Sequence, residues 1–439
     1  MYDTTSGRPN RARPLHFSVL AAALLATFAA APASAAWVCD LDGVEGIDAP
    51  DADGDGAFAC GDNSWAQGNG STALGAHAFA TAAHATAMGW ESSARALGAI
   101  AVGSQAAAGF EGAISIGFLS EAGQNGTVIG RDAKSLAANA VIVGAYGTAG
   151  ENATAIGSSS RAEGSGSTAV GYISEAAGQF STALGQFARA LGDTATAVGA
   201  GAYAQGEFTT AVGTQSNATG IWGTALGQDA RATGTHATAL GRQSRATDVG
   251  TTAVGVGANA TALYATAIGN AASAASQAVA LGRDATASGV QSLAAGVSAQ
   301  ASGQGATAVG DLARATGYGA AGFGWDAQAL QDYSVAIGAG SRATRAYTVS
   351  FGHADGLRRQ LVNVAEGTQD FDAVNLRQMR AAISAVDLGP FAAAFGGGAS
   401  YVGGTFTPPS YSIQGSAYGN AGDAFSAIDG QLSAIIARA

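Results

Sequence analysis

The sequence predicts an all-β solenoid, in which a short coil of two β-strands is repeated along most of the chain. Glycines recur at a nearly fixed interval from Gly75 to Gly352: of 20 successive steps, 17 are 14 residues long and three are 13. The composition agrees, because 66 of the 439 residues are glycine and only 12% are charged, which is more typical of a repeat protein than of a globular enzyme. We call these the closing glycines; they stand at positions 75, 89, 103, 117, 130, 144, 157, 171, 185, 199, 213, 227, 241, 255, 269, 282, 296, 310, 324, 338 and 352.

Side chains around each closing glycine follow a period of two residues, which is the period of a β-strand. The residue before the glycine is bulky and apolar in 20 of 21 coils, the residue three before it is usually Thr, Val or Ile, and Ala lies between them in 16 coils. After the glycine, 19 of 21 residues at the third place are Ala or Ser, and 19 of 21 at the fifth place are Ala. These patterns predict two short strands per coil, each followed by a turn.

The same alternation indicates which side chains face inward. We expect the bulky residue before each closing glycine, such as Val198, to line the interior of the coil together with the threonine row. The residue four places after the glycine, such as Arg189, lies between two small residues and is expected to face water. The Ala and Ser rows of the second strand would then be buried by packing several identical rolls side by side, which predicts a homo-oligomer.

Two segments resemble YadA-like trimeric autotransporter adhesins of Gram-negative bacteria. The first is the repeated Thr-Ala-Val-Gly phrase, as at 168–171. The second is a neck-like motif at 359–367 (Arg-Gln-Leu-Val-Asn-Val-Ala-Glu-Gly) and 372–379 (Asp-Ala-Val-Asn-Leu-Arg-Gln-Met). The resemblance implies a homotrimeric, left-handed parallel β-roll head of 14-residue coils over residues 63–357, followed by a neck at 358–380.

The first 35 residues have the pattern of a secretory signal peptide. Arg11 and Arg13 precede an apolar run from Phe17 to Ala31, and Ala33-Ser34-Ala35 is a small-x-small cleavage site. The run is short for a membrane span. We therefore expect an exported protein, located at the bacterial cell surface or outer membrane, or released outside the cell.

An acidic segment at 36–62 carries both cysteines of the chain, Cys39 and Cys60. In an exported protein these two are expected to form a disulfide. Between and after them, Asp51, Asp53, Asp55 and Asp62 occupy positions 1, 3, 5 and 12 of a calcium-loop spacing, with Gly56 at position 6. The segment is therefore a candidate calcium site; the alternative is an acidic linker whose Asp and Gly residues favour turns.

The C-terminal part is expected to begin a stalk. Residues 381–422 are expected to contain a short helix ending near Pro390 and a glycine-rich connector, and 423–439 the start of a coiled coil. Apolar residues in both helical stretches are spaced three, four and three apart: Leu376, Met379, Ile383 and Val386 in one, Phe425, Ile428, Leu432 and Ile435 in the other. The resembling family ends in a membrane anchor that this sequence does not include, so we expect attachment to the outer membrane only through such an anchor.

The predicted function is a cell-surface adhesin, a trimeric spike that binds host matrix proteins or cell-surface glycans at many equivalent coils. The sequence contains no recognisable set of catalytic residues, so we expect no enzyme activity. A net charge of −11 argues against nucleic acid as a partner. The alternative is an ice-binding or other structural solenoid. That alternative needs an outward threonine row, whereas the sharing of the threonine position with Val and Ile predicts an inward one.

Overall fold

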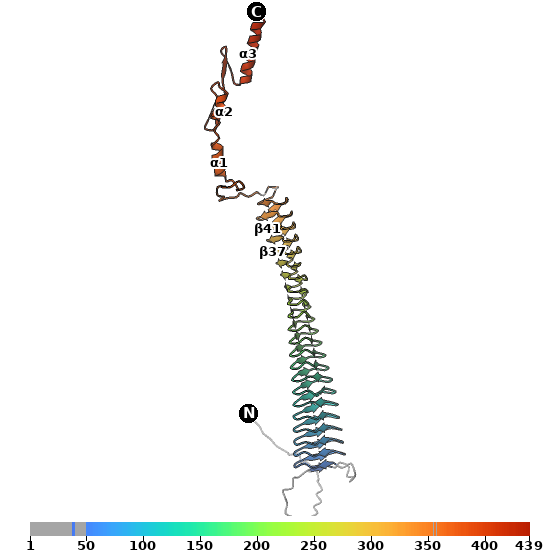
Figure 1. Ribbon diagram of the computed structural model, residues 1–439. Helices are drawn as coiled ribbons and strands as arrows, with labels where there is room; N and C mark the ends of the chain where they lie inside the picture. The colour runs from blue at the N-terminus through green and yellow to red at the C-terminus, as the bar shows by residue number, and fades with distance from the viewer. Residues whose placement is uncertain (1–36, 40–49, 354, 357) are drawn as a thin grey trace, which may run out of the picture. The chain divides into compact units, whose positions relative to one another are not determined.

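The computed structural model describes residues 37–39, 50–353, 355–356 and 358–439. These fall into two compact units that divide between residues 357 and 358. The first unit is a stack of coils, in which strands β37 (Leu293–Ala295) and β41 (Ala321–Phe323) are labelled in Figure 1. No helix in the described part of the chain is long and apolar enough to cross a membrane.

Each coil contributes two strands, one to each of two parallel sheets. In a typical coil, β21 (Thr182–Leu184) holds the three residues before the closing glycine, and β22 (Arg189–Ala190) holds the fourth and fifth residues after it. We call the sheet of three-residue strands the long sheet and that of two-residue strands the short sheet. Strand β21 pairs in parallel with β23 (Thr196–Val198), so that equivalent residues of successive coils lie side by side. The predicted all-β parallel solenoid is confirmed.

The interior of each coil is filled by small side chains. Ala183, between Thr182 and Leu184, is 0% exposed, and so are Ala188 and Ala190 on the short sheet. Leu184 is 36% exposed, and Thr182 lies beside it on the same outer face. The prediction that the bulky residue and the threonine line the interior is therefore wrong. Because every coil contributes only two short strands, the sheets lie close together and the space between them accepts alanine rather than leucine.

The closing glycines are required where successive coils meet. Gly185 has a φ of +133°, and a Cβ added there would lie 2.7 Å from the carbonyl carbon of Gly199 in the next coil. Only glycine fits both this backbone conformation and this close approach. Each closing glycine thus marks a turn at which the backbones of successive coils are in contact.

The three 13-residue coils keep the strands in register, as expected. Strand β13 (Thr127–Ile129) belongs to the first of them and pairs residue for residue with β11 (Ile114–Ile116). Strand β17 (Thr154–Ile156) pairs in the same way with β15 (Val141–Val143). The missing residue is therefore removed from a turn, and the phase of inward and outward side chains is unchanged.

The coil stack begins earlier than residue 63. Strand β1 (Trp37–Cys39) pairs in parallel with β3 (Phe58–Cys60), and β2 (Asp51–Ala52) pairs with β4 (Trp65–Ala66). The division into a separate segment 36–62 and a head that starts at 63 is therefore incorrect. The described residues of 36–62 form strands of the same two sheets.

The second unit contains three helices and two β-hairpins. Helices α1 (Leu376–Ser384) and α2 (Gly389–Ala394) precede the hairpins, and α3 (Ala421–Ile436) follows them. Strand β46 (Ser400–Val402) pairs antiparallel with β47 (Thr405–Thr407), and β48 (Tyr411–Ile413) pairs with β49 (Ser416–Tyr418). The segment predicted as a glycine-rich connector is thus an ordered pair of hairpins.

Candidate functional site

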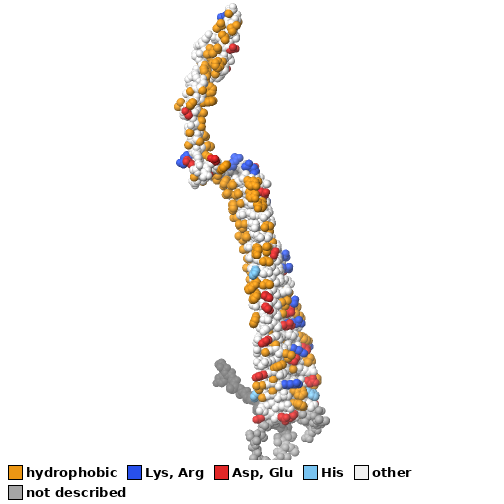
Figure 2. All heavy atoms as spheres, in the orientation of Figure 1, with side chains coloured by type: hydrophobic (Ala, Val, Ile, Leu, Met, Phe, Trp, Pro, Cys, Tyr) orange, Lys and Arg blue, Asp and Glu red, His pale blue; other side chains and the backbone are white. Residues whose placement is uncertain are grey.

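The outer face of the long sheet carries an apolar row. We call it the apolar face: the bulky residue before each closing glycine, with the threonine row beside it. Leu226 and Leu240 on this face are 43% and 41% exposed. Figure 2 shows hydrophobic side chains along one side of the coil stack. A continuous apolar surface of this extent marks an interaction site.

The threonine row is unbroken over nine coils. Thr154 and Thr266 are its ends, and each threonine is paired in register with the next. Their side chains lie on the outer face of the long sheet beside the bulky row; Thr224 is exposed and the other eight are half-buried. The sequence predicted that this row faces the interior of the coil, whereas in the structure it lies on the surface.

The outer face of the short sheet carries a row of cationic side chains, as predicted. We call it the cation row; its members are exposed and stand four places after a closing glycine: Lys134, Arg161, Arg189, Arg231, Arg245, Arg314 and Arg342. Because the two sheets face opposite ways, this row and the apolar face lie on opposite surfaces of the coil. Figure 2 shows Lys and Arg side chains gathered along one side of the stack.

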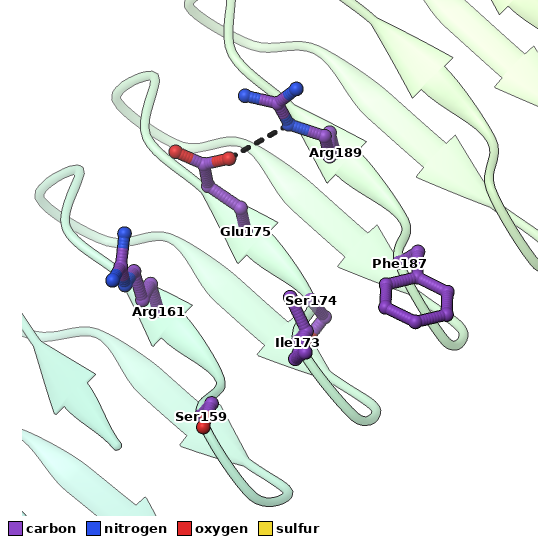
Figure 3. Close-up of a pocket in the computed structure, with 7 residues that line it drawn as sticks. All are labelled: Ser159, Arg161, Ile173, Ser174, Glu175, Phe187 and Arg189. Carbon is purple, nitrogen blue, oxygen red and sulfur yellow. Dashed lines mark hydrogen bonds and ion pairs between the residues drawn. The ribbon is translucent and has the colours of Figure 1, made fainter. Parts of the chain in front are cut away.

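A shallow pocket lies where the cation row passes Glu175. Arg161, Glu175 and Arg189 are neighbours in register on the short sheet, and Arg189 Nε donates to Glu175 Oε2 at 2.8 Å. Ile173 and Phe187 border the pocket at the adjoining turn (Figure 3). The Glu175 carboxylate and the Arg189 guanidinium satisfy each other here, whereas Arg161 makes no ion pair with any described residue within 4 Å.

Exposed rings form a ladder along one turn. Phe208, Trp222 and His236 stand five residues before successive closing glycines, and their ring planes are nearly parallel. The centroids of Phe208 and Trp222 are 4.4 Å apart, and those of Trp222 and His236 are 6.4 Å apart. The sequence holds the signal for this ladder, since the three residues share one position in the repeat, but our sequence analysis did not use it.

Of the four aspartates of the proposed calcium loop, Asp51 and Asp53 lie close together, and Asp55 and Asp62 lie in two different turns. Asp51 lies on the short sheet, Asp55 lies in the turn six residues before Gly61, and Asp62 follows Gly61 in the opposite turn. Burial first, and then the neighbouring Asp53, raises the pKa of Asp51. No group of three or more His, Cys, Asp or Glu side chains in the described ranges is placed to hold a metal ion. Calcium binding itself stays a prediction, and calorimetry at millimolar calcium tests it.

The two cysteines occupy equivalent positions in neighbouring strands. Cys39 and Cys60 are register partners in β1 and β3, with their Cα atoms 4.7 Å apart, and the structure joins them in a disulfide. Each stands at the position that bulky residues take in later coils, since Gly61 directly follows Cys60. The bond therefore links the start of the stack to the strand that follows it.

The neck motif is held by side chains that bind the backbone of its own loop. Asn375 caps helix α1 by accepting from the Gln378 N–H at 2.8 Å, and its amide donates to the Val364 carbonyl at 3.1 Å. The Gln378 side chain accepts from the Gly367 N–H at 3.0 Å and donates to the Gly367 carbonyl at 2.8 Å. The motif thus fixes the loop against the first turn of the helix.

Family models match residues in both units. The model described as "YadA head domain repeat (2 copies)" matches residues 52–78, 80–106, 149–172, 176–202, 204–230, 223–244, 246–272, 273–296, 287–313 and 315–341. The model described as "Coiled stalk of trimeric autotransporter adhesin" matches residues 360–392. The chain belongs to the family of YadA-like trimeric autotransporter adhesins. The stalk match of this adhesin covers all of the neck motif except its first residue, together with helix α1.

Among solved structures, the adhesin matches the "crystal structure of the collagen-binding domain of Yersinia adhesin YadA". The two are 18% identical; the match covers 80% of this chain and 97% of that one, with a TM-score of 0.12. Similarity at this level carries no argument about ligands. A comparison with curated protein sequences gave no match.

Membership of the YadA-like family agrees with the surface chemistry of the coils. The family consists of structural adhesins of the cell surface rather than enzymes. In the described part of this adhesin, the outward threonine, cationic and aromatic side chains lie in rows along the coil stack. Its candidate functional site is therefore the repeated outer surface of the coil stack.

Proposed function

We propose that the chain is exported and forms a homotrimeric spike that binds host extracellular matrix or cell-surface glycans through many coils at once. The observation that carries this proposal is the apolar face, which a single chain leaves open to water. Burying it between copies removes apolar area from solvent, which stabilises association by about 25 cal/mol per Å². Membership of a trimeric family supports three copies.

Assembly through the apolar face would leave the short sheet turned outward. The outer residues of the short sheet, and the turns beside it, would then offer the surface on which a partner can bind. Because the same surface recurs coil after coil and in each copy, weak contacts add up to a high avidity. The repeated architecture therefore supports adhesion better than recognition of one small ligand.

A binding screen tests the adhesive role. The full chain is applied to immobilised matrix proteins, including collagen, and to a glycan array, beside a variant in which Leu184, Val198 and Val212 are changed to Asp. These three neighbours lie on the apolar face. We expect the native protein to bind at least one surface tightly and the variant to lose avidity. Equal binding by both proteins, or binding by neither, contradicts the proposal.

Ice binding is the second candidate function, because the threonine row faces outward and is regularly spaced. An ice-recrystallisation assay on the assembled protein and on the same variant separates the two functions. In our proposal the row is covered by neighbouring copies, so the assembled protein should not inhibit recrystallisation. Strong inhibition by the native protein would favour the ice-binding solenoid.

A further inference from the structure

The outer face of the short sheet changes its chemistry halfway along the stack. We call its C-terminal part the basic strip: the outward residues four and six places after each closing glycine, from Asn217 to Thr344. The strip contains four arginines and no Asp or Glu, although the whole chain has a net charge of −11. On the earlier coils, the same positions hold Glu121, Glu163 and Glu175.

Two arginines of the strip are placed side by side. Arg231 and Arg245 are register partners in strands β28 (Arg231–Ala232) and β30 (Arg245–Ala246), so their backbones lie ~4.8 Å apart. Like charges directly opposite one another destabilise a sheet. At equivalent positions, Glu175 and Arg189 form a pair of opposite charges. The fold therefore does not require two arginines to be neighbours at Arg231 and Arg245.

Three of the carboxylates in the turns beside the strip are already engaged. Asp229 pairs with Arg231 at 3.0 Å, Asp284 pairs with Arg283 at 3.4 Å, and Asp326 accepts from the Gln328 amide at 2.9 Å. Arg245, Arg314 and Arg342 make no ion pair with any described residue within 4 Å and are exposed. Three guanidinium groups on one outward face thus remain open to anions.

We propose that the basic strip binds a linear sulfated polysaccharide lying along the stack. The proposal rests on the adhesive function above and names its ligand class. Guanidinium groups match sulfate and carboxylate groups in shape and charge. Between them, threonines such as Thr233, Thr247 and Thr316 offer hydroxyl groups that can hydrogen-bond to a sugar. The strip holds no aromatic residue on which a base could stack, so its chemistry suits a sugar chain better than single-stranded nucleic acid.

Two triple variants of the full chain test the proposal. The strip variant changes Arg245, Arg314 and Arg342 to Gln. The control variant changes Lys134, Arg161 and Arg189 to Gln, which removes the same charge from the same row outside the strip. Affinity for a heparin oligosaccharide is measured at low and at near-physiological salt, with a melting curve for each protein. We expect roughly a tenfold or greater loss for the strip variant, at most about a twofold loss for the control, and weaker binding at higher salt.

Equal losses from both variants would show general electrostatics and overturn the proposal, as would unchanged binding by the strip variant. So would equally tight binding of single-stranded DNA of matched charge. The matrix-protein screen, run on the same two variants, separates this failure from that of the proposed function. Retained matrix binding without heparin binding overturns only the sulfated-ligand assignment, whereas the loss of every ligand by the native protein overturns both.

Discussion

At the residue scale, Ile142 shows how closely the coil interior is filled. It is 0% exposed at a position where most coils have alanine, and it faces Gly147, where most coils have Ala or Ser. A Cβ added to Gly147 would lie 2.6 Å from Ile142 Cγ2. The two residues therefore fill the volume that a pair of alanines fills elsewhere.

The first prediction is a thermodynamic coupling between these two residues. Gly147→Ala should lower the free energy of unfolding by about 1–3 kcal/mol because it overpacks the coil, and Ile142→Ala should cost about 2–5 kcal/mol through a cavity. The double variant restores the usual coil and should cost less than the sum. Denaturant melts of all four proteins check this, and additive effects would show that the two side chains do not share one space.

The second prediction concerns three adjacent surfaces of one coil. Ala197 is 0% exposed, so Ala197→Asp should bury a charge and lower the free energy of unfolding by at least ~2 kcal/mol. Val198→Asp should leave the coil intact and weaken association, because Val198 lies on the apolar face. Arg189→Asp loses an exposed ion pair with Glu175 and a cation–π contact with Tyr203, each worth about 0–1 kcal/mol at an exposed site, so its cost should be the smaller of the two stability changes. Melting curves and sedimentation of the three variants test the order; coil unfolding by Val198→Asp alone would reverse our assignment of faces.

These residues also show where sequence reasoning succeeds and fails. The period of two correctly separates Ala197 from Val198 and places Arg189 outside. It cannot say which set faces inward, and the usual rule that larger apolar residues are buried gives the wrong answer. Which set is buried depends on the distance between the two sheets of the coil. That distance is short because the closing glycines and the alanines allow the backbones to approach closely.

At the scale of elements, the neck loop depends on one carboxylate. Asp372 Oδ2 accepts from the Thr368 N–H at 2.9 Å and from the Gln369 N–H at 3.0 Å. These backbone donors, that of Thr368 first, hold the pKa of Asp372 below its ordinary value of 3.8. A depressed pKa in the folded state stabilises the loop above the unfolded pKa, and this stabilisation is lost as the pH falls through the folded pKa.

The third prediction is therefore an acid-induced loosening of the neck. The amide protons of Thr368 and Gln369 should shift together in NMR spectra, with a midpoint below pH 3.8. Asp372→Asn should remove the titration while the coils keep their spectrum. A midpoint above the ordinary value would mean that these hydrogen bonds are absent in solution.

Elements outside the main repeat were the least predictable. The turns of the two hairpins, Gly403-Gly404 and Gln414-Gly415, contain residues with positive φ, as two-residue hairpin turns require. Their flanking strands are only three residues long, too short to show an alternating pattern. The first coils were missed because the strands β1 and β2 lack the repeated phrase, and because β1 pairs with a strand 21 residues ahead rather than 14.

The fourth prediction concerns the start of the stack. The bond between Cys39 and Cys60 spans 21 residues of sequence, and a loop of this size gives about 3 kcal/mol of stability in the chain-entropy account. Cys60→Ser should therefore loosen the first strands and leave later coils unchanged, which hydrogen exchange along the chain can resolve. Non-reducing mass spectrometry of exported protein should find no free thiol, and two free thiols would contradict the bond.

At the scale of the whole molecule, the two outer surfaces of the coil stack differ in regularity and in charge. The apolar face is regular over many coils and carries no charged side chain in the nine coils of the threonine row, which suits packing against identical copies. The short sheet varies from coil to coil in charge and size, which suits recognition of a ligand. The sequence alone predicted an oligomer but assigned the contact to the alanine rows, which the structure buries inside each coil.

Sedimentation of the full chain tests the central claim most directly, beside the variant with Asp at Leu184, Val198 and Val212. The native protein should sediment as three chains, and the variant should shift toward single chains with the same far-ultraviolet circular dichroism spectrum. A native protein that sediments as a stable monomer, or a variant that remains fully trimeric, would contradict assembly through the apolar face.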